Sequence, residues 1–342
     1  MKYDTAHQRT FALRRETLSD LSRQLSNRLI GQPAAVEAIV PYVEMYDAGL
    51  SPEGRPAGVF LLLGPTGTGK TKTVEALAEI LHGSEGCLLK IDCGEFQMEH
   101  EVAKLIGAPP GYLGHRETQP VLSQQRLNMA TSDRCGLALV LFDEIEKAAP
   151  SLGRLLLGVL DKGVLRLGDN STVNFEHSLV FLTSNLGSSE MMNELCPNFG
   201  FQAAFRTARN GLHGKIGSIA IAAVRKKFSP EFINRIDRII TYRPLDESSL
   251  AGILDQHIEE LKRHVTRRLG PRSFEIDVPY ESRRFLLQLG TSPAFGAREL
   301  KRTVLRHLTQ PIASLVAGGR IAPGASVRVE LDSDKQGLCI RY

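Results

Sequence analysis

The sequence predicts an α/β fold, in which a large domain with a parallel sheet between helices is followed by a smaller α+β domain. From Thr17 to about Tyr242, short apolar runs alternate with helical patterns. This alternation is typical of a parallel sheet that is covered by helices on both faces. After Arg243 and Pro244, helical patterns come with short segments in which apolar and polar residues alternate, as expected of an α+β domain.

These changes of pattern divide the chain into three parts. Residues 1–16 form a polar, basic tail, and Thr17 opens a helical pattern in which leucines recur every three or four residues. We expect the large domain to cover residues 17–242 and the small domain to cover residues 243–342. At 342 residues, the chain is long enough to build two hydrophobic cores.

The apolar runs and helical patterns also predict individual elements. The large domain has runs typical of buried strands at 59–63, 88–92, 137–143 and 178–183. In the small domain, helical patterns lie near 247–269, 280–290 and 297–317, and alternating strands at 274–278 and 327–331.

The most specific motif in the chain follows the apolar run 59–63. It has the pattern G-x-x-x-x-G-K-[ST] of a phosphate-binding loop and reads Gly64-Pro65-Thr66-Gly67-Thr68-Gly69-Lys70-Thr71. Its glycines allow the backbone to turn its N–H groups toward phosphates, and the helix that follows adds a partial positive charge. Lys70 would reach the β- and γ-phosphates, and Thr71 would offer a hydroxyl to magnesium (Mg2+). A glycine-rich turn with a chance lysine is the weaker interpretation, because the motif lies between strand and helix.

Two acidic residues end the apolar run 137–143 and complete this chemistry. Asp143 is placed to hold magnesium through its water shell, and Glu144 to polarise the water that attacks the γ-phosphate. An ordinary acidic strand end is the alternative. The two motifs together predict an ATPase with ATP and Mg2+ as cofactors, although a kinase also carries both motifs.

Composition limits the function classes further. Hydrophobic residues make up 42% of the chain and charged residues 23%, as in ordinary soluble proteins. The net charge of +4 is too small to indicate nucleic-acid binding, and we interpret the basic stretch 262–268 as a solvated helix face.

Cysteine usage and apolar runs bear on the compartment. The five cysteines are scattered, without the spacing of a disulfide framework or zinc site. The N-terminus lacks the apolar core of a signal peptide, and no run reaches the ~20 residues that cross a membrane. We therefore expect a cytoplasmic protein that binds neither membrane nor nucleic acid.

Several stretches, in this order, resemble the second ATPase module of the Clp-type AAA+ chaperones, the ClpA, ClpB and ClpC family. The resemblance extends from about Leu18 to the C-terminus. The stretches are 29–32 (LIGQ), the phosphate loop, 107–114 (GAPPGYLG), 142–148 (FDEIEKA), 183–188 (TSNLGS), 228–237 (FSPEFINRID) and 296–302 (GARELKR). The resemblance implies an AAA+ ATPase domain and a C-terminal lid domain.

The resemblance also implies roles around the nucleotide. Asn185 would be the first sensor, an amide that positions the attacking water, and Arg298 the second sensor, which closes the lid onto the phosphates. Ile30 and Gly31 would pack near adenine. The alternatives are an asparagine that ends a strand in a turn and a surface arginine in a weak ion pair.

Arg235 has the role with the widest consequence. In the family it is the arginine finger, which completes the site of the neighbouring subunit and implies a homo-oligomeric ring, usually a hexamer. The alternative is an arginine that pairs with Asp237 or Glu231 in its own subunit.

Tyr112 points to a protein substrate. Gly111, Tyr112, Leu113 and Gly114 resemble the pore loop of rings that thread polypeptide, in which an aromatic side chain grips the chain without regard to its sequence. A tyrosine packed in a turn is the alternative. A second loop at 163–170 is a weaker candidate for the same channel.

Some parts of the sequence depart from the family. The large members carry an N-terminal domain, a first ATPase ring and a middle domain, whereas this sequence resembles one module. Residues 189–227 follow the family poorly, and Phe199-Gly200-Phe201 is only loosely like the tripeptide that docks some members onto a peptidase. A loop or core pair of phenylalanines is the favoured interpretation of this tripeptide.

The favoured function is an ATP-driven unfoldase that threads unfolded or aggregated proteins through a ring pore. One alternative is a regulatory subunit that feeds a Clp-type peptidase. Two less favoured alternatives are an assembly switch that only binds ATP and a loader that acts on nucleic acid.

Overall fold

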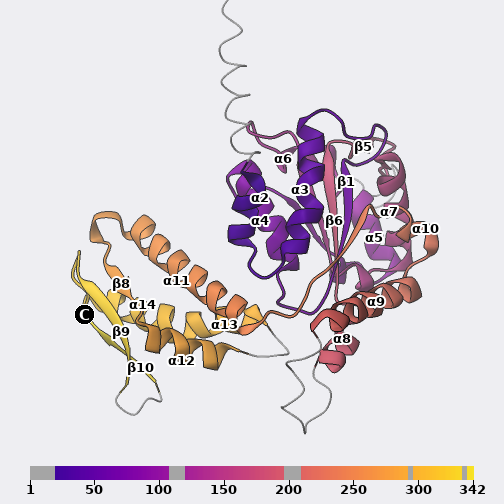
Figure 1. Ribbon diagram of the computed structural model, residues 1–342. Helices are drawn as coiled ribbons and strands as arrows, with labels where there is room; N and C mark the ends of the chain where they lie inside the picture. The colour runs from indigo at the N-terminus through magenta and orange to yellow at the C-terminus, as the bar shows by residue number, and fades with distance from the viewer. Residues whose placement is uncertain (1–19, 108–119, 196–208, 292–295, 333–336) are drawn as a thin grey trace, which may run out of the picture. The chain divides into compact units, whose positions relative to one another are not determined.

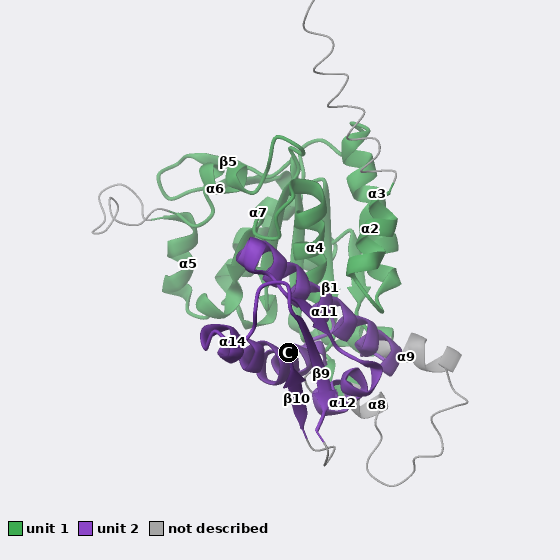
Figure 2. Ribbon diagram, turned by 90° about the vertical axis from the view of Figure 1, so that its left-hand side faces the viewer, with its two compact units in different colours: residues 1–65, 69–243 green, residues 66–68, 244–342 purple. Residues whose placement is uncertain are grey.

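The computed structural model of the chain describes residues 20–107, 120–195, 209–291, 296–332 and 337–342 (Figure 1). The chain divides into two compact units (Figure 2). The first unit contains residues 1–65 and 69–243, and the second contains residues 66–68 and 244–342.

The first unit alternates strands and helices along most of its length. Its strands are β1 (Gly58–Leu63), β2 (Leu89–Asp92), β3 (Ala138–Asp143), β4 (Val164–Arg166), β5 (Thr172–Asn174), β6 (Ser178–Ser184) and β7 (Arg238–Thr241). Its helices are α2 (Leu21–Arg28), α3 (Pro33–Asp47), α4 (Lys70–His82), α5 (Glu99–Ile106), α6 (Gln124–Met129), α7 (Pro150–Lys162), α8 (Ser188–Leu195), α9 (Arg209–Lys227) and α10 (Pro230–Ile233). Short 3-10 helices span Cys93–Glu95 and Ile145–Lys147.

Five of these strands form a parallel sheet with the order β2-β3-β6-β1-β7. Every residue of β1 and β6 is buried, which explains why both read as continuous apolar runs in the sequence. The predicted parallel sheet is confirmed, and its four predicted strands correspond to β1, β2, β3 and β6. The edge strand β7, a short segment that begins with an exposed arginine, was not predicted.

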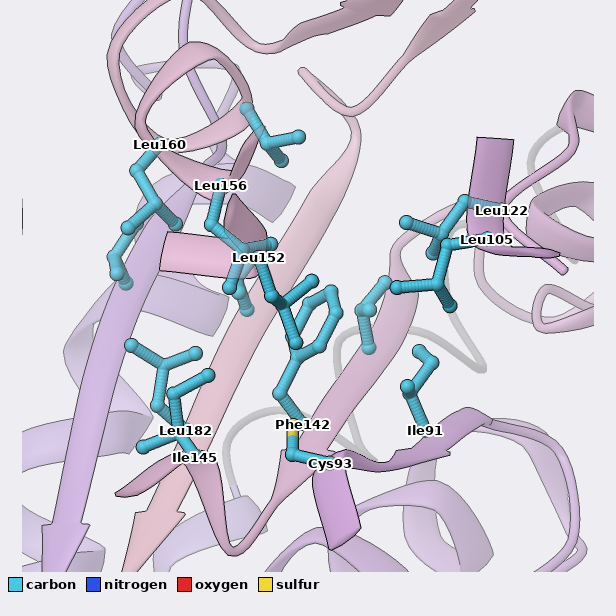
Figure 3. Close-up of a cluster of buried hydrophobic side chains, with 14 of the residues drawn as sticks. Ile91, Cys93, Leu105, Leu122, Phe142, Ile145, Leu152, Leu156, Leu160 and Leu182 are labelled. Atoms are coloured by element: carbon cyan, nitrogen blue, oxygen red, sulfur yellow. The ribbon is translucent and has the colours of Figure 1, made fainter. Parts of the chain in front are cut away.

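Side chains from the two faces of this sheet enter two separate cores. Phe60 and Leu62 of β1 pack with α2, α3 and α4, whereas Val59 and Leu61 pack with α5, α6, α7 and α9. Figure 3 shows part of the second core, in which Phe142 and Leu182 of the sheet lie near Leu152, Leu156 and Leu160 of α7. Burial on both faces fixes the strands, so that their carboxyl ends form a firm platform for the residues that follow them.

The second unit is an α+β domain, as predicted. Its helices are α11 (Glu247–Leu269), α12 (Tyr280–Gly290), α13 (Ala297–Val304) and α14 (Gln310–Ala317), with a 3-10 helix at Gly270–Arg272. Its strands β8 (Glu275–Asp277), β9 (Ser326–Leu331) and β10 (Leu338–Arg341) form one sheet in the order β10-β9-β8. Strands β8 and β9 are parallel, and β10 runs antiparallel to β9.

The helix expected at 297–317 is not one regular α-helix. A π-helical turn, Leu305–Thr309, separates α13 from α14. Pro311 follows this turn and has no N–H to donate to the carbonyl of His307, so the regular bonding pattern cannot continue there. Strand β10, with no fully buried residue, was also missed from the sequence.

Candidate functional site

The phosphate loop begins where β1 leaves the sheet. Gly64 has a φ of +148°, and a Cβ added there would lie 2.6 Å from the carbonyl oxygen of Tyr242. Tyr242 is itself fixed, because its N–H donates to the carbonyl of Leu63 at 2.6 Å and its buried hydroxyl lies 2.6 Å from Thr73 Oγ1. Burial raises the pKa of the Tyr242 hydroxyl, so that it stays neutral. Only glycine fits at the first position of the loop.

Lys70 lies at the other end of the loop, in the first turn of α4. Gly69, directly before it, has a φ of +103°, which glycine adopts without strain. The buried Lys70 Nζ donates to the carbonyls of Gly64 and Pro65 at 2.5 and 2.9 Å and to Asn185 Oδ1 at 2.9 Å. The ammonium group therefore lies inside the loop, held by neutral oxygen atoms.

Asp143 ends β3 beside the start of α4. Its carboxylate oxygens lie 3.4 and 3.5 Å from Thr71 Oγ1 and 3.4 Å from Lys90 Nζ on β2. The buried hydroxyl of Thr183, on β6, also donates to Asp143 Oδ1. The parallel register of β3 with β2 and β6 brings these side chains to one edge of the sheet.

These residues fit a magnesium ion that is bound together with nucleotide phosphates. In the described part of the chain, no three His, Cys, Asp or Glu side chains are grouped as a metal site by themselves. Mg2+ in nucleotide sites is held by one or two protein oxygen ligands, with water and phosphate oxygens completing its shell. A hydroxyl and a carboxylate within 3.5 Å of each other match that donor set.

Glu144 lies one residue beyond β3 in a left-handed backbone conformation, with a φ of 56°. Its N–H donates to Thr183 Oγ1 at 3.0 Å, so one buried hydroxyl holds both acidic residues. Its Oε1 lies 3.4 Å from Asn185 Nδ2, and its Oε2 accepts a hydrogen bond from Lys147 Nζ. Because a non-glycine residue at positive φ is uncommon, this conformation and its three contacts indicate that the surrounding structure fixes the orientation of Glu144.

Asn185 joins the two ends of this arrangement. It follows β6, its N–H donates to Glu146 Oε1 at 3.0 Å, and its side chain contacts both Lys70 and Glu144. The predicted sensor therefore lies between the predicted phosphate-binding lysine and the predicted base. The structure brings these three residues together, while their chemical roles stay predictions.

Cys93 lies beneath this group of acids. It is fully buried, and burial together with Asp92, Asp143, Glu146 and Glu144 raises the pKa of its thiol. The thiol therefore stays protonated and acts as a small apolar side chain in the core.

The turn that contains Ile30 and Gly31 connects α2 with α3. Gly31 has a φ of 79°, and Leu29 lies close to the phosphate loop, since a Cβ added to Gly69 would be 3.4 Å from Leu29 Cδ1. Gln32 is buried and fixes the turn, with its amide bonded to the backbone of Arg243 at 2.8 and 3.2 Å. Contact of Ile30 and Gly31 with adenine stays a prediction.

Arg235 follows α10 and is partly exposed. Its Nε lies 3.1 Å from Asp161 Oδ1, near the end of α7. Asp237 instead pairs with Arg55 at 2.7 Å and accepts a hydrogen bond from Val59 N at 2.8 Å. Arg235 is therefore paired within its own subunit, as the alternative expected, but with Asp161 and not with the predicted Asp237 or Glu231. A finger that acts on a neighbouring subunit stays a prediction.

The other predicted residues are placed as follows. Arg298 is exposed in the first turn of α13, in the second unit, and Thr66, Gly67 and Thr68 at the tip of the loop are grouped with that unit. The predicted pore loop, with Gly111, Tyr112, Leu113 and Gly114, lies outside the described residues, as does Phe199-Gly200-Phe201.

The two candidate channel loops have adjoining bases in the first unit. The carbonyl of Ile106, at the end of α5, accepts a hydrogen bond from Gly168 N at 2.8 Å. Gly168 lies in the turn between β4 and β5, which pair as an antiparallel hairpin. The hairpin was not predicted, and the part of both loops in a channel stays a prediction.

Four residues that support the site were not predicted. Thr183 and Lys147 lie within stretches that we singled out, but no spacing rule identifies which atoms they contact. Asp161 and Tyr242 are distant in sequence from their partners, and only the fold brings them together.

Known protein families match both units of the chain. A family model described as AAA domain (Cdc48 subfamily) matches residues 55–239. A second model, described as the C-terminal, D2-small domain of ClpB protein, matches residues 245–329. Among the described residues, none of the helices has the length and apolar character needed to cross a bilayer.

Individual relatives agree with these matches. Chaperone protein ClpB of Meiothermus ruber is 37% identical over 317 residues, which cover 92% of this chain and 34% of the relative. Chaperone protein ClpB of Pseudomonas putida is 37% identical over 321 residues, which cover 94% of this chain and 34% of the relative. The chain thus spans about a third of the length of these relatives and resembles their second module.

Solved structures of Hsp104 are similar over nearly the whole chain. One, described as a closed state of Hsp104 with ATPyS and FITC casein, has a TM-score of 0.79 at 26% identity and covers 99% of this chain and 53% of that chain. The Hsp104-ADP complex of S. cerevisiae has a TM-score of 0.79 at 28% identity, and the match covers 96% of this chain and 53% of that chain.

Proposed function

Because this chain belongs to the AAA domain family (Cdc48 subfamily) and is an ATPase of that family, we propose that it uses ATP hydrolysis to remodel other proteins. One observation carries the proposal. Lys70, Asn185 and Glu144 form a continuous chain of contacts at 2.9 and 3.4 Å, beside the Thr71 and Asp143 pair. This arrangement supports hydrolysis of a nucleoside triphosphate at the site.

Each residue has a part in this reaction. The loop and Lys70 would bind the phosphates, and Thr71 and Asp143 would hold magnesium, which stabilises charge on the phosphate oxygens. Glu144 would take the proton of the attacking water, while Asn185 fixes the position of that water. Lys70 would leave the carbonyls of Gly64 and Pro65 when phosphate oxygens arrive, since a charged acceptor is preferred over a neutral one.

The choice of a protein substrate rests on the relatives. They are named chaperones, and one Hsp104 structure includes casein. We propose that Tyr112 grips a polypeptide, that Arg235 acts on a neighbouring subunit, and that subunits form a ring, with six as the expected number. A cytoplasmic location and the absence of nucleic acid stay predictions from the sequence, and delivery to a Clp-type peptidase is the alternative use.

Unfolding of a stable tagged protein tests the proposal. The chain with ATP and magnesium should unfold the protein, and unfolded polypeptide should raise the ATPase rate. Tyr112→Ala should keep the basal ATPase rate within a few-fold and lose unfolding, because the proposed role of Tyr112 is to grip the polypeptide and not the nucleotide. Unfolding by Tyr112→Ala at the wild-type rate would remove the argument for threading.

Two added components separate the alternatives. A Clp-type peptidase in the same reaction should convert unfolding into degradation only if the chain feeds a peptidase. DNA that stimulates the ATPase, when unfolded protein does not, would favour a loader of nucleic acid.

A further inference from the structure

Lys147 binds the side chain of Glu144, the proposed base that follows β3. Glu144 precedes the 3-10 helix Ile145–Lys147, and the N–H of Lys147 donates to the carbonyl of Glu144 at 2.9 Å. This bond closes a turn in which residues 144 and 147 are separated by the three-residue spacing of a 3-10 helix. The buried Ile145 fixes the rotation of this turn against the core. The turn and the left-handed conformation of Glu144 bring the two side chains within reach, and the ammonium group binds the carboxylate.

The two carboxylate oxygens of Glu144 have different partners. Oε1 lies toward Asn185, which is itself held by Glu146 through its N–H and by Lys70 through its side chain. Oε2 accepts the hydrogen bond from Lys147 Nζ. The contact with Glu144 also raises the pKa of Lys147, which keeps the lysine charged. One oxygen thus faces Asn185, which contacts Lys70 of the phosphate loop, while the other is bound by Lys147.

We propose that Lys147 is a positioning residue for hydrolysis, which holds Glu144 Oε2 so that Oε1 stays directed at the water beside Asn185. This inference rests on the proposed hydrolysis at Glu144. In the part of the chain that the structure describes, the ammonium group of Lys147 pairs with Glu144, so it acts on the orientation of the base and leaves nucleotide binding to other residues. Its exposed side chain, 49% accessible, makes this ion pair too weak to matter for folding.

The size of the effect follows from the torsions of the glutamate side chain. Without the ammonium group, the carboxylate can turn among staggered positions, and each freed torsion reduces the productive population by about threefold. Lys147→Met keeps the length of the side chain and removes its charge and donors. We therefore expect kcat to fall about three- to tenfold in this variant while KM and the Kd for ATP stay within twofold.

A conservative replacement and a matched control complete the experiment. Lys147→Arg keeps a cation that can donate to Oε2 and should recover most of the rate. Lys262→Met removes another lysine–glutamate pair with the same three-residue spacing, that with Glu259 in α11, and should keep the wild-type kcat. The melting temperatures of all three variants should match that of the wild type within about two degrees.

The outcomes distinguish this inference from the proposed function. If the wild type hydrolyses ATP and Glu144→Gln does not, the proposed site stands. Wild-type or faster turnover in Lys147→Met then overturns the positioning role alone, as does a failure of Lys147→Arg to exceed Lys147→Met. A parallel loss of ATP affinity or melting temperature in Lys147→Met would also overturn it, because it indicates a structural role.

Discussion

Gly64→Ala tests whether the start of the phosphate loop is set by close packing. The new methyl group would lie 2.6 Å from the carbonyl oxygen and 2.9 Å from the Cβ of Tyr242, closer than real Cβ contacts come. Overpacking of this kind costs about 1–3 kcal/mol, and a φ of +148° costs a residue other than glycine about another 1–3 kcal/mol. Tyr242 cannot move away cheaply, since its N–H and its hydroxyl are both bonded.

We expect Gly64→Ala to lose about 2–6 kcal/mol of the free energy of unfolding, a large share of the 5–15 kcal/mol of a typical domain. Denaturant unfolding measures the stability, and a fluorescent ATP analogue measures binding, which should be lost because the loop starts in the wrong place. Gly49→Ala is the control. Gly49 also has a positive φ, of +70°, but nothing lies within 4 Å of its added Cβ, so about 1–2 kcal/mol is expected. Equal effects of the two substitutions would refute the packing argument.

Three further predictions concern Thr183, Arg235 and His82. Thr183→Val should lower the free energy of unfolding by about 1–3 kcal/mol and raise the magnesium concentration needed for hydrolysis. The reason is that the N–H of Glu144 and the carboxylate of Asp143 lose a buried partner. Thr183→Ser should behave as wild type. Arg235→Ala should bind ATP but lose about 10³-fold in turnover. If the finger acts in trans, mixing Arg235→Ala with Glu144→Gln should restore activity. No recovery in such mixed rings would contradict a finger that acts in trans. Burial lowers the pKa of His82, so the unfolded chain takes up a proton at a higher pH than the folded chain does. The free energy of unfolding should therefore be highest above about pH 6.5 and fall as the pH drops below it. His82→Gln should flatten this pH dependence in thermal melts.

The large-scale fold was predictable because burial leaves a clear mark on the sequence. Strands β1 and β6 are buried over their whole length and read as apolar runs, and Gly69 and Gly83 mark the two ends of α4. Strand β7 and the β4–β5 hairpin left no such mark, since they are short and partly exposed. The π-helical turn before Pro311 forms because one backbone carbonyl has no N–H donor opposite it. The helical periodicity of the sequence does not reveal such a local change.

The site was predictable where function fixes the local sequence. The phosphate loop and the Asp143-Glu144 pair are continuous in sequence, and Asn185 falls on a neighbouring strand end that the parallel order brings alongside. The partners of these residues could not be found in this way. Tyr242 meets Thr73 across 169 residues, and Asp161 reaches Arg235 only because α7 and α10 pack together. Such contacts depend on tertiary packing, which no local pattern encodes.

Paired binding and turnover measurements on Glu144→Gln test the central claim most directly. The amide cannot accept the proton of water, but the magnesium site at Asp143 and the phosphate loop remain, so the Kd for ATP should stay within a few-fold while kcat falls by about 10²–10⁴. Lys70→Ala should instead lose binding itself. Hydrolysis by Glu144→Gln at the wild-type rate would contradict the account.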